Sequence, residues 1–159
     1  MTSVFLRFEE KLFKLLRVIL SLLVIGLIVV VLAQVVFRYF LKNSLSWSVE
    51  ASNFLFVWIV FIGAVLGVHD NSHVGLDLVI KAVPEKIRER MNLIANDVVI
   101  IFLVILTYYG TKFTILMSRN MAEAMPISYS WLYVSVPVST ILMIIAIFGN
   151  NLRRKEGKK

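Results

Sequence analysis

Residues 18–37 read VILSLLVIGLIVVVLAQVVF, twenty consecutive positions without an Asp, Glu, Lys or Arg. A bilayer core about 30 Å thick is crossed by about 20 apolar residues of helix, because each residue rises about 1.5 Å. The stretch therefore predicts a transmembrane helix, which its apolar flanks extend to about residues 15–40. It is too long for the apolar core of a secretory signal, and no small-x-small cleavage site follows it, so we expect it to remain in the protein.

Three further stretches without charged side chains, residues 51–69, 98–111 and 124–152, raise the uncharged total to 82 of 159 residues. Hydrophobic residues make up 59% of the chain and charged residues 17%, against roughly 45–50% and 25% in soluble domains. Too little chain remains for a soluble catalytic domain. We predict an all-α integral membrane protein, a single membrane domain over residues 1–159 with further spans at about 47–68, 92–118 and 127–150.

The third span needs an extension, because its 14 uncharged residues give only about 21 Å of helix. Extending it to about residues 92–118 places Asp97 and Lys112 near opposite ends. Lys112 can then reach the headgroups, and Asp97 suits the positive end of the helix dipole.

The seventeen basic residues are distributed unevenly between the two ends of the predicted spans. Thirteen precede the first span, lie between the second and third, or follow the fourth, and only Arg38, Lys42, Lys112 and Arg119 lie at the other end. Because Lys and Arg accumulate in cytoplasmic segments, we predict that both termini are cytoplasmic. The net charge of +7 is then a signal of topology and does not indicate nucleic-acid binding.

Residues 1–17 are predicted to form an amphipathic helix on the inner membrane surface. The apolar positions at helical spacing are Phe5, Phe8, Leu12 and Leu16, with basic and acidic residues among them. The alternative is that this stretch simply extends the first span.

The loop between the second and third spans is also predicted to be helical. Residues 74–83 form a largely apolar segment with an Asp77–Lys81 pair at i, i+4, which favours a short inner-loop helix. Pro84 then fits the first position of a new helix, which we expect to continue unbroken to about Ser118.

Polar side chains inside or beside the spans are the candidates for function, since such groups are costly in a bilayer. Gln34 and Arg38 are i, i+4 neighbours on the outer half of the first span, and Glu50 lies in the opening turn of the second. We predict an Arg38–Glu50 ion pair that closes this hairpin. The alternative is that Arg38 reaches lipid phosphate while Glu50 only complements the helix dipole.

Gly63 and Gly67 form a GxxxG step in the second span, a spacing that lets helix backbones approach closely. Packing within the chain and packing against another chain both remain open. Trp47 lies at the outer end of this span, as an interfacial anchor should, whereas Trp58 lies inside it.

Pro137 interrupts the fourth span and predicts a kink, because it frees the carbonyl of Tyr133. We expect the hydroxyl of Ser135 or Ser139 to satisfy this carbonyl.

The sequence predicts no catalytic, substrate-binding or metal site and no cofactor. It contains no cysteine, which excludes disulfides and thiol chemistry. His69 and His73 stand at i, i+4 beside Asp70 and Asp77, as in half a metal site, but their place at the end of a span favours a helix-ending loop. No span has a central acidic residue or a Gly/Pro-rich break, so we expect the helices to support a partner and not to form a transport pathway.

Several short motifs follow one another over the predicted spans. They are QVVFRY at 34–39, SLSWS at 44–48 with Glu50, FVW at 56–58, Gly63 with Ala64, His73 with Asp77, Pro84, and Pro126 followed by Tyr133 and Pro137. In order and spacing this set resembles the DctQ family, the small membrane subunits of tripartite ATP-independent periplasmic (TRAP) transporters. The resemblance covers about residues 15–150. The chain departs from the family pattern at Val49, where an acid is usual, and at Asn53, where a basic residue is common.

The resemblance implies a non-catalytic subunit of a sodium-coupled uptake system for organic acids of the sialic acid, C4-dicarboxylate or sugar-acid class. In that family a periplasmic binding protein delivers the acid to a large membrane subunit, which carries the substrate and sodium sites. The small subunit packs against the fixed scaffold of the large one in the bacterial inner membrane, among membrane lipids. The candidate structural or partner-interface residues are Gln34, Arg38, Trp47, Glu50, Trp58, Gly63, Gly67, His73 and Asp77.

Two other functions are alternatives to this one. A self-sufficient small-molecule exporter acting as a homodimer is expected to carry an acidic residue in its first span, and residues 18–37 have none. A membrane enzyme or cytochrome accessory subunit would be recognised by bound haem, for which histidines inside the spans are expected.

Overall fold

The computed structural model describes residues 2–43, 45–70 and 85–156, which are helical apart from the connections. The elements are α1 (Thr2–Tyr39), α2 (Ser46–His69), α4 (Glu85–Leu116), the 3-10 turn η1 (Met117–Arg119), α5 (Ser130–Tyr133) and α6 (Ser135–Glu156). Four segments are long and apolar enough to cross a membrane: Phe5–Tyr39, Ser46–His69, Asn96–Arg119 and Ser130–Arg153. The predicted all-α, four-span fold is confirmed.

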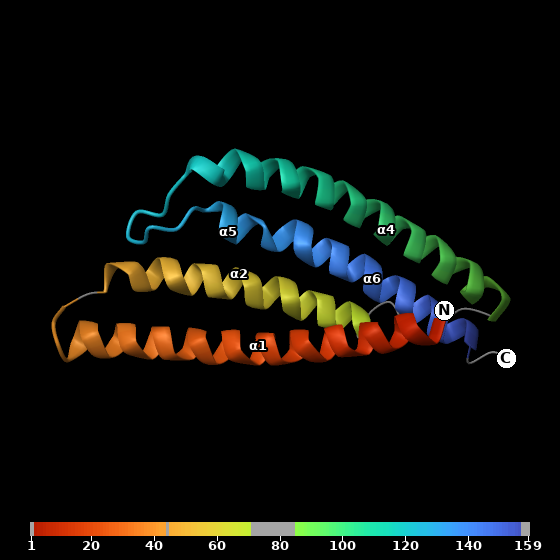
Figure 1. Cartoon of the computed structure of the whole chain (residues 1–159), viewed down its shortest axis with the longest axis horizontal. Coiled ribbons are helices and arrows are strands. Elements are labelled where there is room, and N and C mark those ends of the chain that lie inside the picture. Colours follow the sequence, from red (N-terminus) through yellow and green to blue (C-terminus); the bar gives the residue numbers. More distant parts are fainter. Residues whose placement is uncertain (1, 44, 71–84, 157–159) are drawn as a thin grey trace.

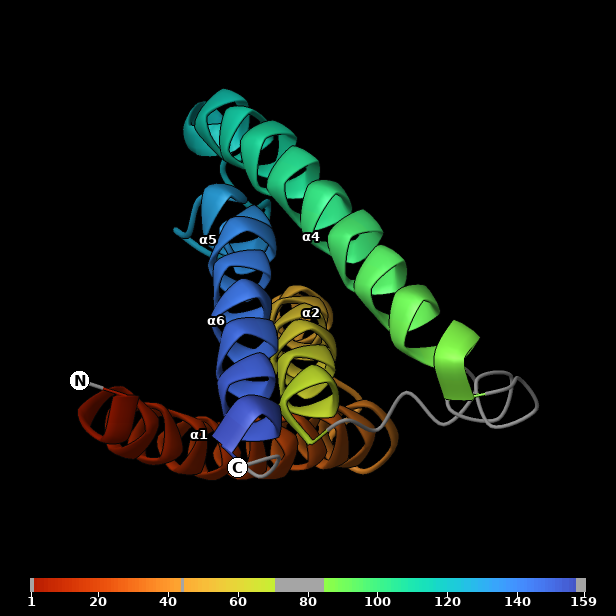
Figure 2. The ribbon, with the colours of Figure 1, turned by 90° about the vertical axis from the view of Figure 1, so that its right-hand side faces the viewer.

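The helices form an open layer in the order α1, α2, α6, α4 (Figure 1). α6 is the central helix, since it packs on both α2 and α4 and also touches α1. Within the described ranges, no Cα of α4 lies within 8 Å of a Cα of α1 or α2. Seen along the long axis, α4 runs obliquely to α2 and α6 (Figure 2). The fold is therefore not a closed four-helix bundle, and α1 and α4 keep broad faces without a partner among the described residues.

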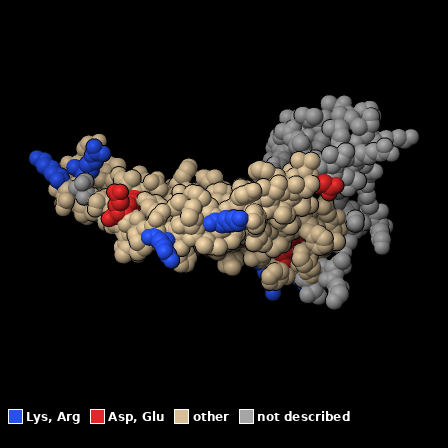
Figure 3. Space-filling view, turned by 90° about the horizontal axis from the view of Figure 1, so that it is seen from above, with Lys and Arg blue, Asp and Glu red and all other residues tan. Residues whose placement is uncertain are grey.

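The core lies where α1, α2 and α6 meet, towards the end of the molecule that carries both termini (Figure 1). Its buried side chains are Phe13, Leu16, Ile62, Val65, Leu66 and Ala146. Elsewhere on α1 and α4 large apolar side chains are exposed, for example Leu22 (63%) and Ile101 (60%). On the face drawn in Figure 3, uncharged side chains cover most of the described surface, as expected of a protein surrounded by lipid.

α1 is one unbroken helix of 38 residues, about 57 Å long and almost twice the thickness of a bilayer core. The amphipathic N-terminal stretch is helical, as predicted, but it is the beginning of α1, so it extends the first span. Only part of its predicted apolar face, which was expected to lie on the membrane, packs inside the protein. Glu9 and Phe13 are buried with Leu16, while Phe8 is 62% exposed. The physical reason is that α2 and α6 supply partners for the Glu9 carboxylate.

α4 and η1 together run without a break from Glu85 to Arg119, which confirms the long helix predicted before the fourth span. Pro84, the predicted inner-loop helix at 74–83 and the candidates His73 and Asp77 lie outside the described residues.

The fourth span is divided into α5 and α6, with the interruption at Val134, three residues before Pro137. A break was predicted here, but the predicted role of the serines is wrong. The Ser135 hydroxyl donates to the carbonyl of Leu132 at 2.6 Å and not to Tyr133. The Ser139 hydroxyl is buried and has no hydrogen-bond partner among the described residues. The Ser135 hydroxyl reaches Leu132 because a serine side chain commonly bonds to the carbonyl three or four residues before it, and Tyr133 is only two residues before Ser135.

Candidate functional site

The predicted candidate residues within the described ranges do not converge on one site. Gln34 is half-buried near the end of α1, and Arg38 and Trp47 are exposed on either side of the connection between α1 and α2. Glu50 and Trp58 make contacts within the chain, whereas Gly63 and Gly67 lie further along α2 without close neighbours.

Glu50 holds the connection between η1 and α5. Its two carboxylate oxygens accept hydrogen bonds from the backbone N–H groups of Glu123, at 2.7 Å, and Ala124, at 3.0 Å. The predicted Arg38–Glu50 pair is wrong: no ion pair within 4.0 Å involves either residue in the described part of the chain. The Arg38 guanidinium instead lies 5.9 Å from the ring centroid of Tyr39. Hydrogen bonds from two fixed backbone amides to a carboxylate are charge-assisted. An exposed ion pair with a long, flexible arginine side chain contributes less to stability.

Trp58 holds α5 against α2. Its indole Nε1–H donates to the carbonyl of Trp131 at 3.0 Å, which gives the N–H a partner inside a membrane span. The ring of Phe54, one turn earlier, stacks on Tyr129 with 5.9 Å between centroids. Together with Glu50, these residues of α2 anchor the segment that joins the third and fourth spans.

The GxxxG step of α2 is not a close contact between the described helices. A Cβ placed on Gly63 or on Gly67 would meet no atom of the described residues within 4 Å, which speaks against packing on α1, α4 or α6, one form of the first alternative. The close approach between helices occurs instead at Gly110 of α4, where a Cβ would lie 3.0 Å from Cγ1 of Val136 and 3.4 Å from Cδ of Pro137. The sequence analysis did not single out Gly110.

The structure also brings together a cluster of charged side chains that the sequence analysis missed. Glu9 of α1 has no solvent exposure, and its Oε1 lies 2.8 Å from the Arg153 guanidinium of α6 and 3.7 Å from Nε2 of His69 of α2. The His69 ring stacks on Phe13 with 4.0 Å between centroids. The backbone at Gly149 lies directly against the Glu9 carboxylate, which occupies the space of a Cβ at that position.

The same cluster continues to the end of α2. Asp70 lies 2.6 Å from the Arg17 guanidinium and 2.9 Å from Nδ1 of His69. The hydrogen bond from His69, assisted by the positive charge of Arg17, holds the pKa of Asp70 below its usual value. Asn150 of α6 donates to the carbonyls of Val68 and His69 at 3.0 and 3.2 Å, so it caps the end of α2.

We call this set the ion cluster; its members are Glu9, Arg17, His69, Asp70 and Arg153. The sequence contained a signal for it, because Glu9, Phe13, Leu16 and Leu20 recur at i, i+4, i+7 and i+11. This stripe was not recognised in the sequence, because Glu9 was assigned to the charged face of the amphipathic N-terminal helix. Within the described ranges, no three His, Asp or Glu residues are grouped as metal ligands. The chemistry of the cluster is therefore ion pairing, which ties three helices together at one end.

Comparison with known proteins gives a consistent result. A sequence profile described as "Tripartite ATP-independent periplasmic transporters, DctQ component" matches residues 27–156. A TRAP transporter small permease protein of Haemophilus influenzae is 30% identical over 140 residues, which cover 86% of this chain and 83% of that protein. The C4-dicarboxylate TRAP transporter small permease protein DctQ of Vibrio cholerae is 32% identical over 74 residues, 46% of this chain and 32% of that one.

A longer relative shows the same likeness within a larger polypeptide. The sialic acid TRAP transporter permease protein SiaT of Haemophilus influenzae is 28% identical over 137 residues, which cover 86% of this chain but 22% of SiaT. In SiaT, a region similar to this chain is joined covalently to a much longer remainder.

Proposed function

Because the chain belongs to the DctQ family and is a TRAP transporter small permease subunit, we propose that it braces the large membrane subunit of its transporter. It is a multi-pass protein of the bacterial inner membrane. In this role it binds no substrate and catalyses no reaction.

The open layer of helices is the observation that carries the proposal. A subunit that transported alone would have to enclose a polar path, whereas here α1 and α4 are separated and large apolar side chains make up much of their exposed surface. Such faces suit lipid or the helices of another membrane protein. The length of SiaT beyond the similar region supports a large permease as that neighbour.

We place the contact with the large subunit on the exposed face of α2. Gly63 and Gly67 leave open space on this face, and Ala64 adds a third small side chain, so another helix can approach the backbone closely. Gln34, Arg38 and Trp47 lie near the start of α2 and are the further candidates for the interface, together with His73 and Asp77.

The substrate class and the energy source belong to the whole transporter. Small permease proteins similar to this chain carry names that refer to sialic acid and to C4-dicarboxylate. Similar small subunits thus accompany different organic acids, which supports a substrate site in the other subunits. We propose uptake of an organic acid driven by a sodium gradient, with a periplasmic binding protein as donor.

The thirteen-to-four distribution of basic residues supports cytoplasmic termini.

Co-purification and transport test this function. The tagged chain should recover the large subunit from native membranes, and Gly63→Leu combined with Gly67→Leu should reduce that recovery at least tenfold. Val29→Phe, which adds bulk on the exposed face of α1, should not. In proteoliposomes, uptake should require the large subunit, the binding protein and a sodium gradient. Solute flux through this chain alone, as in a homodimeric exporter, would contradict the proposal.

A further inference from the structure

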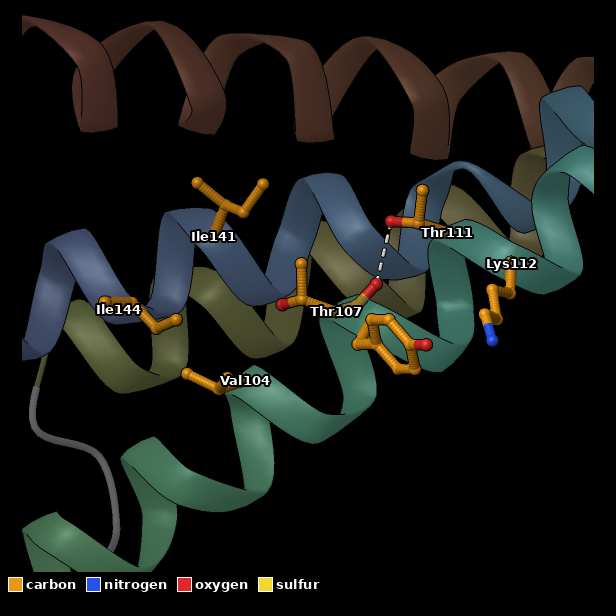
Figure 4. A pocket seen from close by; sticks show the side chains of 7 residues that line it. Val104, Thr107, Thr111, Lys112, Ile141 and Ile144 are labelled. Carbon is orange, nitrogen blue, oxygen red and sulfur yellow. Dashed lines mark hydrogen bonds between the residues drawn. The ribbon is translucent and has the colours of Figure 1, made fainter.

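A groove of about 430 Å³ runs along the surface between α4 and α6 (Figure 4). Val104 of α4 and Ile141 and Ile144 of α6 line its inner part, towards the middle of the helices. Lys112, with Tyr108 one turn before it, lines the part nearer η1. The groove is thus graded, with apolar side chains deep in the span and a cation near one end.

The threonines of the groove do not make it polar. The hydroxyl of Thr107 donates to the carbonyl of Leu103 at 2.7 Å and lies 2.7 Å from the hydroxyl of Thr140. Thr111 donates to the carbonyl of Thr107, also at 2.7 Å (Figure 4). Because both hydroxyls bond to their own helix, the ammonium of Lys112 and the phenol of Tyr108 are the polar groups left to contact a ligand.

Lys112 is a cation inside a membrane span. It precedes the end of the span at Arg119 by seven residues, so it lies roughly 10 Å from that end along the helix. Its ammonium lies 4.7 Å from the ring centroid of Tyr108, and no carboxylate of the described residues lies within 4.0 Å of it. The ring attracts the cation only weakly. A charge at this depth still needs a counter-charge, and the described part of the chain does not supply it.

We propose that the groove binds one phospholipid, whose phosphate pairs with Lys112 and whose acyl chain lies between α4 and α6. The stretch from Lys112 to Val104 is eight residues, about 12 Å of helix, close to half of a bilayer core about 30 Å thick. One leaflet's acyl chain therefore follows the groove while the phosphate stays near the headgroup level, where a lysine side chain can reach it. The site requires only that the chain lies in a bilayer.

The size of the groove favours a lipid over a protein segment. Over the length of about 12 Å from Lys112 to Val104, a volume of about 430 Å³ corresponds to a groove about 6 Å across. A transmembrane helix with its side chains is about 10–12 Å across and is too wide to enter it. A single acyl chain is narrow enough, and the phosphate supplies the negative charge that Lys112 lacks. An acidic side chain of another subunit is the competing counter-charge.

Native mass spectrometry of the full-length chain tests the site. After detergent exchange, the wild-type chain should retain one phospholipid. Lys112→Gln should weaken this binding at least tenfold, Lys112→Arg should preserve it, and Ile141→Trp, which fills the groove, should abolish it. Arg119→Gln and Val98→Trp are the matched controls for charge and bulk outside the groove, and both should bind as the wild type does. Circular dichroism confirms that each variant compared is folded.

Binding measurements with lipids that differ in their headgroups identify the source of the negative charge. Phosphatidylglycerol and phosphatidylethanolamine should both bind, because each carries a phosphate; binding of phosphatidylglycerol alone would support a site for anionic lipid. Diacylglycerol, which has no phosphate, should not bind. Equal retention of lipid by Lys112→Gln, or equal binding of diacylglycerol, would overturn the proposal. So would a complex in which Lys112 cross-links to an acid of the large subunit and no lipid is found.

Discussion

Glu9 of α1 contacts both other helices of the ion cluster, through His69 of α2 and Arg153 of α6. A carboxylate without solvent exposure is costly unless it is paired, and Glu9 is paired through one oxygen only. Its Oε2 has no hydrogen-bond partner among the described residues. Because Gly149 lies against the carboxylate, a larger residue at position 149 would displace Glu9 from Arg153.

Removing the Arg153 guanidinium should therefore lower the free energy of unfolding more than removing an exposed charge does. We expect Arg153→Met to lower the free energy of unfolding in detergent micelles by about 3 kcal/mol, because it leaves Glu9 buried without its main partner. The double variant with Glu9→Gln should regain more than half of the loss, since no charge is then left unpaired. Lys14→Met, at an exposed position on α1, the helix of Glu9, should change the free energy of unfolding by less than about 0.5 kcal/mol. A similar effect of Arg153→Met and Lys14→Met would contradict a structural ion cluster.

The connection between η1 and α5 is held in place by α2, the second helix of the α1–α2 hairpin. It folds back on itself through two backbone hydrogen bonds, from Ala122 to Ile127 and from Tyr129 to Asn120, both 2.9 Å long. Glu50 of α2 binds the tip of this turn, so the ends of the second, third and fourth spans are joined. This is why Glu50 has a role although its predicted partner Arg38 lies elsewhere.

Hydrogen exchange distinguishes the two partners of Glu50. Glu50→Ala should speed exchange at the amides of Glu123 and Ala124 at least tenfold, because a lost hydrogen bond to a charged group costs roughly 1.5–3 kcal/mol and about 1.4 kcal/mol is a factor of ten. Arg38→Ala should leave the exchange of both amides unchanged. An equal effect of the two substitutions would instead support the ion pair that the structure lacks.

The whole molecule is an open layer whose two edge helices never meet. α1 packs on α2 and α4 packs on α6, so the layer is held by α2 against α6 in the middle and by the ion cluster at one end. A monomer that leaves so much apolar surface uncovered suits a lipid-filled or subunit-filled environment on both sides.

Introduced cysteines report this arrangement without background, because the chain has none of its own. Gly110→Cys with Val136→Cys should form a disulfide, since a Cβ on Gly110 would lie 3.4 Å from Cβ of Val136, near the separation of about 3.5–4.5 Å in disulfides. The smaller side chain at position 136 also relieves the tight contact. Gly26→Cys with Gly110→Cys should stay reduced, because α1 and α4 do not approach. Thiol labelling followed by mass measurement detects both results, and a bond between positions 26 and 110 would indicate a closed bundle.

The number of spans was determined by the sequence alone, and so was the family. The length of the first helix was not, because the N-terminal stretch continues α1. A bilayer requires each crossing segment to satisfy its backbone hydrogen bonds internally, so an uncharged run of sufficient length must become a helix whatever surrounds it. The long third helix and the break in the fourth span were predicted from proline positions for the same local reason.

Only the tertiary structure decided which polar residues meet. Glu9 and Arg153 are 144 positions apart, and Glu50 contacts amides 73 and 74 positions away, so no spacing in the sequence relates them. The same separation explains why the burial of Glu9 was not predicted and why the predicted partner of Glu50 was wrong. A charged side chain has the same local pattern whether it faces water or a buried partner, and the crossing of helices chooses between the two.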